Sequence, residues 1–180
     1  MKTATCNRSE CILKGRVFDF YRENLTLPNG VNLDMEIIRH PGAAAIVPVM
    51  ADRSVLLIKQ YRHAVGGYIW EIPAGTLEAD ETPLACAQRE LTEETGYRAL
   101  NFEKLAEITP LPAYSDERIH LFLATDFTRA DQNLDADELL SVHTVDLRQC
   151  MRMIRDGEIQ DAKTITGIQL AAARLGAAAA

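Results

Sequence analysis

Glu90, Glu93 and Glu94 stand at a spacing that places side chains on one face of a helix. Carboxylates at this spacing repel one another. Near the C-terminal end of a helix, their negative charge also opposes the helix dipole. A bound cation would offset both effects, and Mg²⁺ prefers oxygen ligands and bridges carboxylates to phosphates. Taken alone, such a run of charges usually forms a solvated acidic face, and a divalent-metal site is the alternative that would offset the repulsion.

The helix that must position these glutamates has clear ends in the sequence. Thr82 is a good N-cap, Pro83 suits the first helical position, and Gly96 suits the left-handed residue that ends a helix. Apolar residues at helical spacing predict a buried stripe on the same helix: Leu84, Ala87 and Leu91.

A longer fixed pattern runs from Gly75 to Tyr97. It reads Gly, five residues, Glu, seven residues, Arg-Glu-Leu, one residue, Glu-Glu, one residue, Gly and an aromatic residue. This pattern resembles the Nudix box, the signature of Mg²⁺-dependent hydrolases of nucleoside diphosphates linked to a second group, and every defining position is filled. The resemblance implies a Nudix fold, which is an α/β/α sandwich with a mixed sheet.

The resemblance also implies roles for residues in and beside the box. Glu90 and Glu94 would be the principal metal ligands with Glu93 close by, and the backbone carbonyl of Ala74 would be a further ligand. Arg89 would orient a ligand glutamate, a role that suits its two-point hydrogen bonding, and the plain alternative is a surface arginine. The implied cofactor is Mg²⁺, with Mn²⁺ as the alternative.

Segments outside the box resemble the ADP-ribose pyrophosphatase subgroup of this family. These are Gln60–Gly66, Trp70–Gly75 and the segment that begins at His40, and Pro112 lies sixteen residues after Gly96. The resemblance implies Mg²⁺-dependent hydrolysis of ADP-ribose to AMP and ribose 5-phosphate. Pyrophosphatases of GDP-mannose or UDP-glucose share these flanks, and a non-catalytic nucleotide-sensing module is a further alternative. The presence of all three box glutamates favours an enzyme.

A general base is implied in a loop beyond the box, within hydrogen-bond reach of the attacking water. Glu138 stands four residues before Val142, and this register resembles that of the family base. Asp137 and Glu117 are the alternative bases. A solvated acidic loop is the plain alternative for the segment around Glu138.

Other residues are expected to contact the substrate. Arg62 offers two parallel donors to phosphate oxygens. The resemblance puts Glu78 near the substrate and metals and Glu36 on the adenine side across a dimer interface. Glu117 is a further candidate substrate residue. Trp70 suits stacking on a base, although a tryptophan in a strand is more often part of a core.

The chain is expected to have two parts, residues 1–41 and residues 42–180. In the first part, the segments 12–21 and 31–38 alternate apolar and polar residues on either side of the turn signal Leu27–Gly30, which predicts a small antiparallel sheet. Such a sheet cannot bury a core alone. The resemblance implies that it forms a homodimer and contributes to substrate binding, while the second part is the Nudix hydrolase domain.

Mixed strands and helices in the second part favour the α/β/α class. Apolar runs predict strands over residues 43–49, 55–61, 102–108, 119–125 and 143–146. Apolar residues at helical spacing predict two further helices, one that begins near Leu147 and ends at Gly157 and one that ends at Gly176.

Composition limits the class of protein. Of the 180 residues, 47% are hydrophobic, which is enough for a sizeable core. The net charge of −7 and the lack of a basic run argue against nucleic acid and anionic membranes as partners. Since no apolar stretch reaches the length of a membrane span or a signal core, we expect a cytoplasmic enzyme whose four cysteines are free thiols.

Overall fold

The structure is a computed structural model that describes residues 2–177. It divides into two compact units. The first unit runs to Gly42 and includes Thr109–Arg118, and the second holds Ala43–Ile108 together with the chain from Ile119 on.

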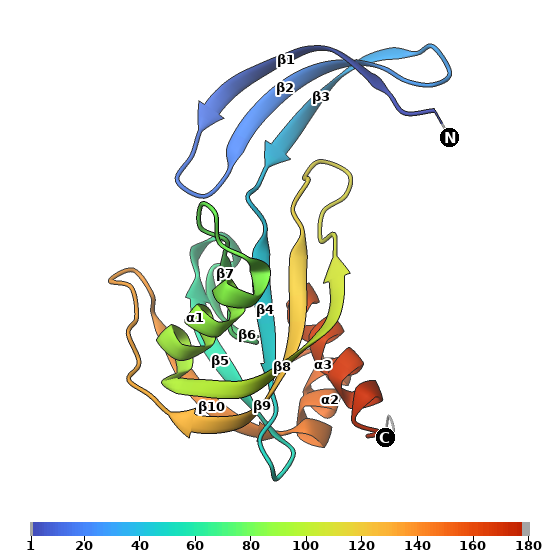
Figure 1. Cartoon of the computed structure of the whole chain (residues 1–180). Helices are drawn as coiled ribbons and strands as arrows, with labels where there is room; N and C mark the ends of the chain where they lie inside the picture. Colours follow the sequence, from blue (N-terminus) through green and yellow to red (C-terminus); the bar gives the residue numbers. More distant parts are fainter. Residues whose placement is uncertain (1, 178–180) are drawn as a thin grey trace. The chain divides into compact units, whose positions relative to one another are not determined.

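The first unit is built on a three-stranded antiparallel sheet (Figure 1). Its strands, in spatial order, are β1 (Thr5–Lys14), β2 (Asp19–Thr26) and β3 (Asn32–Arg39). The small antiparallel N-terminal sheet expected from the sequence is therefore confirmed. One detail differs, because the alternating segment 12–21 is interrupted by the turn between β1 and β2, where Gly15 N donates to Phe18 O.

The segment Thr109–Arg118 joins this unit through the end of β3. Ile38 N donates a hydrogen bond to Tyr114 O at 2.8 Å, and Asp116 N donates to Ile38 O at 3.2 Å. Arg39 then pairs with Asp116 at 3.0 Å and with Glu23 at 2.6 Å.

Up to residue 177, the second unit contains two sheets and three α-helices. One sheet has the order β7 (Ala74–Thr76), β4 (Ala43–Pro48), β9 (Ile119–Arg129) and β8 (Tyr97–Ile108). The other has the order β10 (Leu140–Asp146), β5 (Ser54–Arg62) and β6 (Gly67–Glu71), and a single 3₁₀ turn, η1 (His63–Val65), joins β5 to β6. The pair β4 and β9 is parallel and the other pairs are antiparallel, so the sheet structure is mixed.

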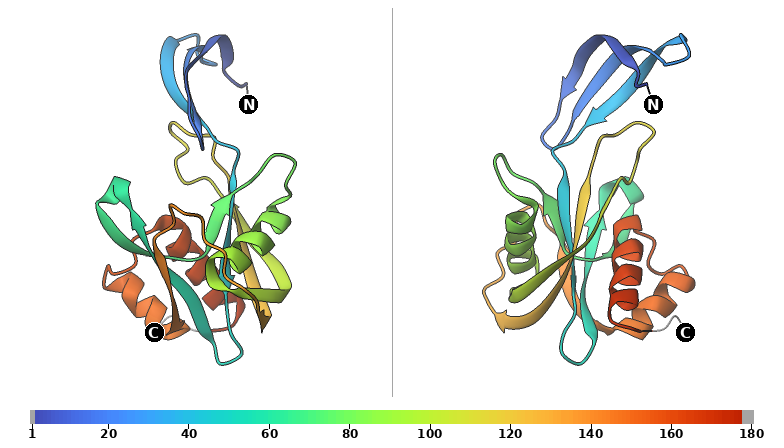
Figure 2. Two further views of the ribbon diagram at one scale, coloured as in Figure 1. Left: turned by 90° about the vertical axis from the view of Figure 1, so that its left-hand side faces the viewer. Right: turned by 45° about the vertical axis from the view of Figure 1, so that its right-hand side comes forward.

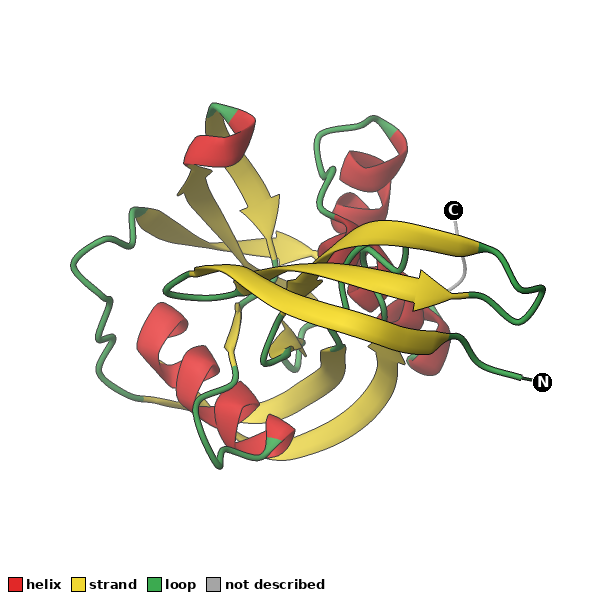
Figure 3. Cartoon of the chain, turned by 90° about the horizontal axis from the view of Figure 1, so that it is seen from above, coloured by secondary structure: helices red, strands yellow, loops and turns green. Residues whose placement is uncertain are grey.

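The helices cover opposite sides of these sheets (Figures 2 and 3). Helix α1 (Pro83–Thr95) lies on one side, and α2 (Leu147–Arg155) and α3 (Ala162–Arg174) lie on the other. Strand β4 is buried on both faces for this reason: Ala45 and Val47 lie in the core beneath α2 and α3, whereas Ala44 and Ile46 lie in the core beneath α1. The predicted α/β/α sandwich is confirmed.

Helix α1 has the ends that its sequence predicts. The Thr82 side chain accepts a hydrogen bond from Ala85 N, and Gly96 adopts a left-handed conformation with φ of 69°. The predicted apolar stripe is wrong at Leu84, which is 42% exposed. Cys86, which is fully buried, takes part in the core on this side instead.

All four cysteines are free, as expected. Cys6 and Cys11 are exposed in β1, whereas Cys86 and Cys150 are buried. Burial raises the pKa of both buried thiols to about 12. Within residues 2–177, no helix has the length and apolar character that crossing a membrane would need.

Candidate active site

Helix α1 and strand β7 bring two acidic side chains into the interior of the second unit. Glu94 is 1% exposed and Glu90 is 9% exposed. Oε2 of Glu94 accepts a hydrogen bond from Ala74 N at 2.9 Å, so the backbone beside the box glycine touches one predicted ligand. A Cβ at Gly75 would lie 1.7 Å from Glu90 Oε1, which means that only glycine lets β7 approach the carboxylate this closely.

Arg89 ties together the acidic side chains around it. Its Nε and Nη2 each donate to Glu81 at 2.9 Å, and its Nη1 donates to Glu90 at 2.6 Å and to Glu93 at 3.1 Å. The arginine predicted to orient a ligand glutamate thus contacts two of the three predicted side-chain ligands. Sequence reasoning assigned no role to Glu81, although this glutamate is itself a fixed position of the box.

Burial disfavours the charged form of both Glu90 and Glu94. Burial is the largest cause that raises the pKa of Glu94 well above its usual value, and the charge of Glu90 adds to it. Burial also raises the pKa of Glu90, while Arg89 opposes the effect. A bound cation would stabilise the charged form of these buried carboxylates. Their oxygens are the kind of ligand that a hard divalent cation such as Mg²⁺ prefers.

The carboxylates are not arranged as a metal cage. Among residues 2–177, no group of three or more His, Cys, Asp or Glu side chains is close enough to hold an ion. Glu90 and Glu93 are engaged by Arg89, and Glu94 is engaged by Ala74 N. Their carboxylate oxygens are the donors that Mg²⁺ prefers, so Glu90, Glu93 and Glu94 stay predicted ligands.

Glu138 lies within electrostatic range of this acidic pair. It is half-buried in the loop before β10, and its charge contributes to the raised pKa of both Glu90 and Glu94. Its Oε2 accepts from Asp135 N at 2.9 Å, and its own N–H donates to Asp135 O, which closes the loop into a turn. Asp137 lies beside it in the same turn.

Glu117, the other candidate base, belongs to the first unit. Its Oε1 lies 3.9 Å from His40 Nδ1. Glu36 is exposed in β3 of the same unit, and its Oε1 lies 3.6 Å from Arg22 Nε.

Arg62 is held by a partner that the sequence did not reveal. Its Nε donates to Glu71 Oε1 at 2.7 Å and its Nη2 donates to Glu71 Oε2 at 2.9 Å. Glu71 is 1% exposed, and Lys163 Nζ reaches its Oε2 at 2.5 Å. The hydrogen bonds with Glu71 are the largest cause that raises the pKa of Arg62, and the charge of Glu94 contributes as well. Arg62 therefore lies within electrostatic range of a predicted metal ligand.

Two further predicted residues lie at the margins. Glu78 is exposed in the loop before α1, where its N–H donates to Glu81 Oε2 at 3.1 Å. Trp70 is half-buried against the core beneath α2 and α3, with its ring 4.8 Å from that of His143. This is the core arrangement that the sequence left open for the tryptophan.

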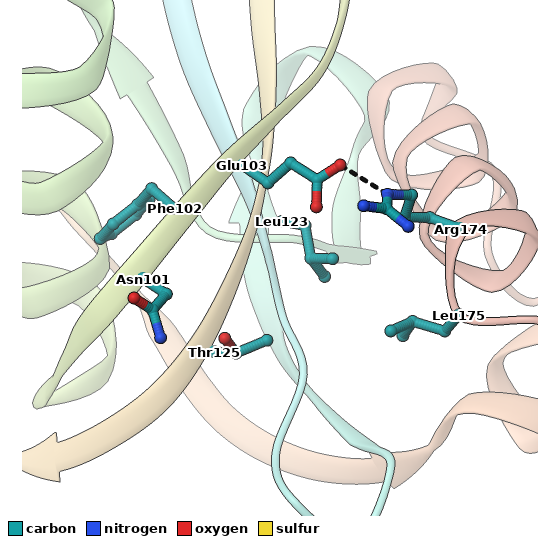
Figure 4. A pocket seen from close by; sticks show the side chains of 7 residues that line it. All are labelled: Asn101, Phe102, Glu103, Leu123, Thr125, Arg174 and Leu175. Carbon is teal, nitrogen blue, oxygen red and sulfur yellow. Dashed lines mark hydrogen bonds and ion pairs between the residues drawn. The ribbon is translucent and has the colours of Figure 1, made fainter.

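The second unit also has a hollow that contains none of the predicted site residues. It measures about 290 Å³ and lies between β8, β9 and the end of α3, with Phe102 and Leu123 in its lining (Figure 4). An ion pair between Glu103 and Arg174 at 2.6 Å stands beside it. Its size alone therefore does not mark the reactive site.

Comparisons with known proteins identify a family and several curated relatives. Residues 39–166 match the family described as NUDIX domain. The chain is 40% identical over 162 residues to an ADP-ribose pyrophosphatase of Bacillus subtilis (strain 168), which covers 89% of this chain and 88% of that protein. It is 36% identical to a methanol dehydrogenase activator of Bacillus methanolicus, and the alignment covers 90% of this chain and 89% of that protein. It is 35% identical to a GDP-mannose pyrophosphatase of Cronobacter sakazakii, and the alignment covers 76% of this chain and 80% of that protein.

A solved structure described as an ADP compounds hydrolase shares the fold. The two superpose with a TM-score of 0.85 over 99% of this chain and 98% of that chain, at 22% sequence identity.

Proposed function

This chain belongs to the NUDIX domain family, and on that premise we propose that it hydrolyses the diphosphate linkage of ADP-ribose to give AMP and ribose 5-phosphate. The observation that carries the proposal is the buried pair Glu90 and Glu94, held between α1 and β7 with Arg62 within electrostatic range. The 40% identity to an ADP-ribose pyrophosphatase over 89% of the chain supports the choice of substrate.

The proposed metal ligands are Glu90 and Glu94, with Glu93 and the Ala74 carbonyl nearby. When bound, Mg²⁺ or Mn²⁺ would neutralise phosphate oxygens and make a water molecule more acidic. Arg89 keeps the glutamates in place, since one nitrogen of its guanidinium donates to both Glu90 and Glu93.

Glu138 is the proposed general base. Its carboxylate would accept the proton of the attacking water. Its charge contributes to the raised pKa values of Glu90 and Glu94, so it lies near the proposed metal ligands. Asp137 and Glu117 remain the alternatives. In this proposal the loop residue Glu138 accepts the proton, while Glu90 and Glu94 of α1 bind the metal.

Arg62 is the proposed phosphate contact. Its hydrogen bonds to Glu71 use Nε and Nη2, which leaves Nη1 for a phosphate oxygen. Glu78, Glu36 and Glu117 complete the proposed substrate residues. We also propose that the protein is a homodimer joined through the sheet of the first unit, because β1 is exposed along its whole length.

Hydrolysis of a substrate panel with Mg²⁺ tests the function. The panel holds ADP-ribose, GDP-mannose and UDP-glucose, with Glu94→Gln as the control variant. We expect ADP-ribose to give the highest kcat/KM and the variant to lose nearly all activity. If another nucleotide sugar leads, the substrate assignment is wrong although the pyrophosphatase reaction stands. Binding of ADP-ribose without turnover of any substrate would replace the enzyme with a nucleotide-sensing module.

A further inference from the structure

A buried carboxylate in the second unit joins an arginine to a distant helix. Glu71, near the end of β6, is 1% exposed and binds the fork of Arg62 with both oxygens. The Arg62 side chain is 42% exposed, so one edge of its guanidinium is fixed inside the protein while the rest reaches solvent. The direction of this arginine therefore depends on the orientation of Glu71.

Lys163 is the other partner that fixes Glu71. Its side chain is 14% exposed, and its Nζ binds Glu71 Oε2 at 2.5 Å and Asp161 Oδ2 at 3.0 Å. Asp161 is also the N-cap of α3, where it accepts from the backbone N–H of Thr164 at 3.0 Å. Thr164 Oγ1 in turn accepts from Ile72 N at 2.8 Å. The start of α3 is thus bound to two successive residues of the chain, Glu71 and Ile72.

The hydrogen-bonding capacity of a carboxylate explains why Lys163 matters. A buried carboxylate needs more than one donor to offset its lost hydration, and Arg62 and Lys163 together supply three hydrogen bonds to Glu71. Without the lysine, Glu71 would keep only the partly exposed arginine. The carboxylate would then reorient or admit water, and Arg62 would follow it.

We propose that Lys163 is a positioning residue for the substrate diphosphate, because it holds Glu71 in the orientation that presents Arg62 to a phosphate. This inference rests on the proposed function, in which Arg62 contacts phosphate. A purely structural ion-pair cluster, which would do no more than attach α3 to the sheet, is the competing explanation.

Kinetics of three variants separate these explanations. Lys163→Met removes the charge, Lys163→Arg keeps it, and Arg174→Met removes an exposed ion pair at the other end of the same helix. With the panel substrate that the wild type hydrolyses best, we expect Lys163→Met to raise KM about tenfold while kcat changes less than about threefold. Lys163→Arg should recover part of the loss, and Arg174→Met should match the wild type. A lowered melting temperature with an unchanged KM overturns the proposal.

A double-mutant cycle tests whether Lys163 acts through Arg62. The double variant Arg62→Met/Lys163→Met should have the same KM as Arg62→Met alone, because the arginine that the lysine positions is already absent. Independent, multiplying effects of the two substitutions contradict the relay. If Lys163→Met does not fold, Lys163→Gln takes its place with the same expectations.

A spectroscopic measurement needs no turnover. The Nε–H resonance of Arg62, assigned by its loss in Arg62→Lys, should shift and exchange faster with solvent in Lys163→Met but not in Arg174→Met. An unchanged resonance overturns the proposal. If the wild type hydrolyses no substrate in the panel, the proposed function fails, while this resonance still decides whether Lys163 holds Arg62.

Discussion

At the scale of single residues, the site depends on the space left by one glycine. We expect Gly75→Ala to lower kcat/KM about 100-fold, because the new methyl group would displace Glu90, and misplacing a reacting group by about 1 Å has an effect of this size. Steady-state kinetics with Mg²⁺ check it. Gly67→Ala is the matched control, since a Cβ there meets nothing within 4 Å and activity should be retained. Equal losses in both variants would mean that the close approach to Glu90 is unimportant.

The base assignment is also a matter of single side chains. We expect Glu138→Gln to lower kcat by about 100-fold or more with little change in KM, because the amide cannot accept the proton of the attacking water. Asp137→Asn and Glu117→Gln should lose much less. A larger kcat loss in either of these variants moves the base to that residue.

Local spacing made some site residues predictable and left others hidden. Glu90, Glu93 and Arg89 lie within about one turn of α1, so the sequence predicts that they are neighbours, and Arg89 contacts both glutamates. The contact between Glu71 and Lys163 spans 92 positions and depends on where α3 docks, so no periodic signal announces it. Glu81 falls between these cases, because its bond to Arg89 spans only eight residues but starts outside the helix.

At the scale of elements, the attachment of α3 to β6 should depend on pH. Burial by itself would raise the pKa of Glu71, but the hydrogen bonds and charges of Arg62 and Lys163 outweigh it and lower the pKa from its usual value. A carboxyl with a lower pKa in the folded state stabilises the fold above its unfolded pKa, and this contribution is lost as the pH falls through the folded-state pKa. We therefore expect the stability advantage of the wild type over Glu71→Gln to shrink as the pH drops below about 4.5.

Urea unfolding at a series of pH values measures this difference. Glu103→Gln is a matched control, because it removes the carboxylate of the exposed ion pair with Arg174, and exposed pairs contribute little. Its stability difference from the wild type should be small at every pH. A wild-type advantage over Glu71→Gln that stays constant into acid contradicts the prediction.

Elements with strong end signals were predictable, and short paired ones were not. Thr82 and Gly96 define α1 through local backbone chemistry, which explains why its bounds follow from the sequence. Strands β6 and β7 are five and three residues long and exist because β5 and β4 pair with them. Glycines and a proline in that stretch hide any alternating pattern.

At the scale of the whole molecule, a divalent cation should stabilise the fold. We expect Mg²⁺ to raise the melting temperature of the wild type, because a ligand at 100 times its Kd adds about 2.7 kcal/mol to the free energy of unfolding. The rise should disappear with EDTA and be absent in Glu94→Gln. An equal rise in both proteins would place the ion elsewhere.

The proposed homodimer is a second property of the whole molecule. We expect a solution mass of about twice 20.0 kDa by light scattering. Leu13 is 61% exposed and Phe18 is 44% exposed, so Leu13→Glu or Phe18→Glu should shift the protein toward the monomer. Leu100→Glu is the control, because this leucine is 70% exposed in the second unit. A wild-type mass of 20.0 kDa contradicts the dimer.

The distribution of the four thiols determines where a chemical label can attach. Cys6 and Cys11 are exposed in β1, whereas Cys86 and Cys150 are buried with pKa values of about 12. Thiolate is the reactive form, so a maleimide dye at neutral pH would modify the first strand and spare the buried cysteines. Because β1 is the proposed dimer surface, the rate at which Cys6 and Cys11 react with the maleimide should fall as the protein concentration rises and the dimer forms.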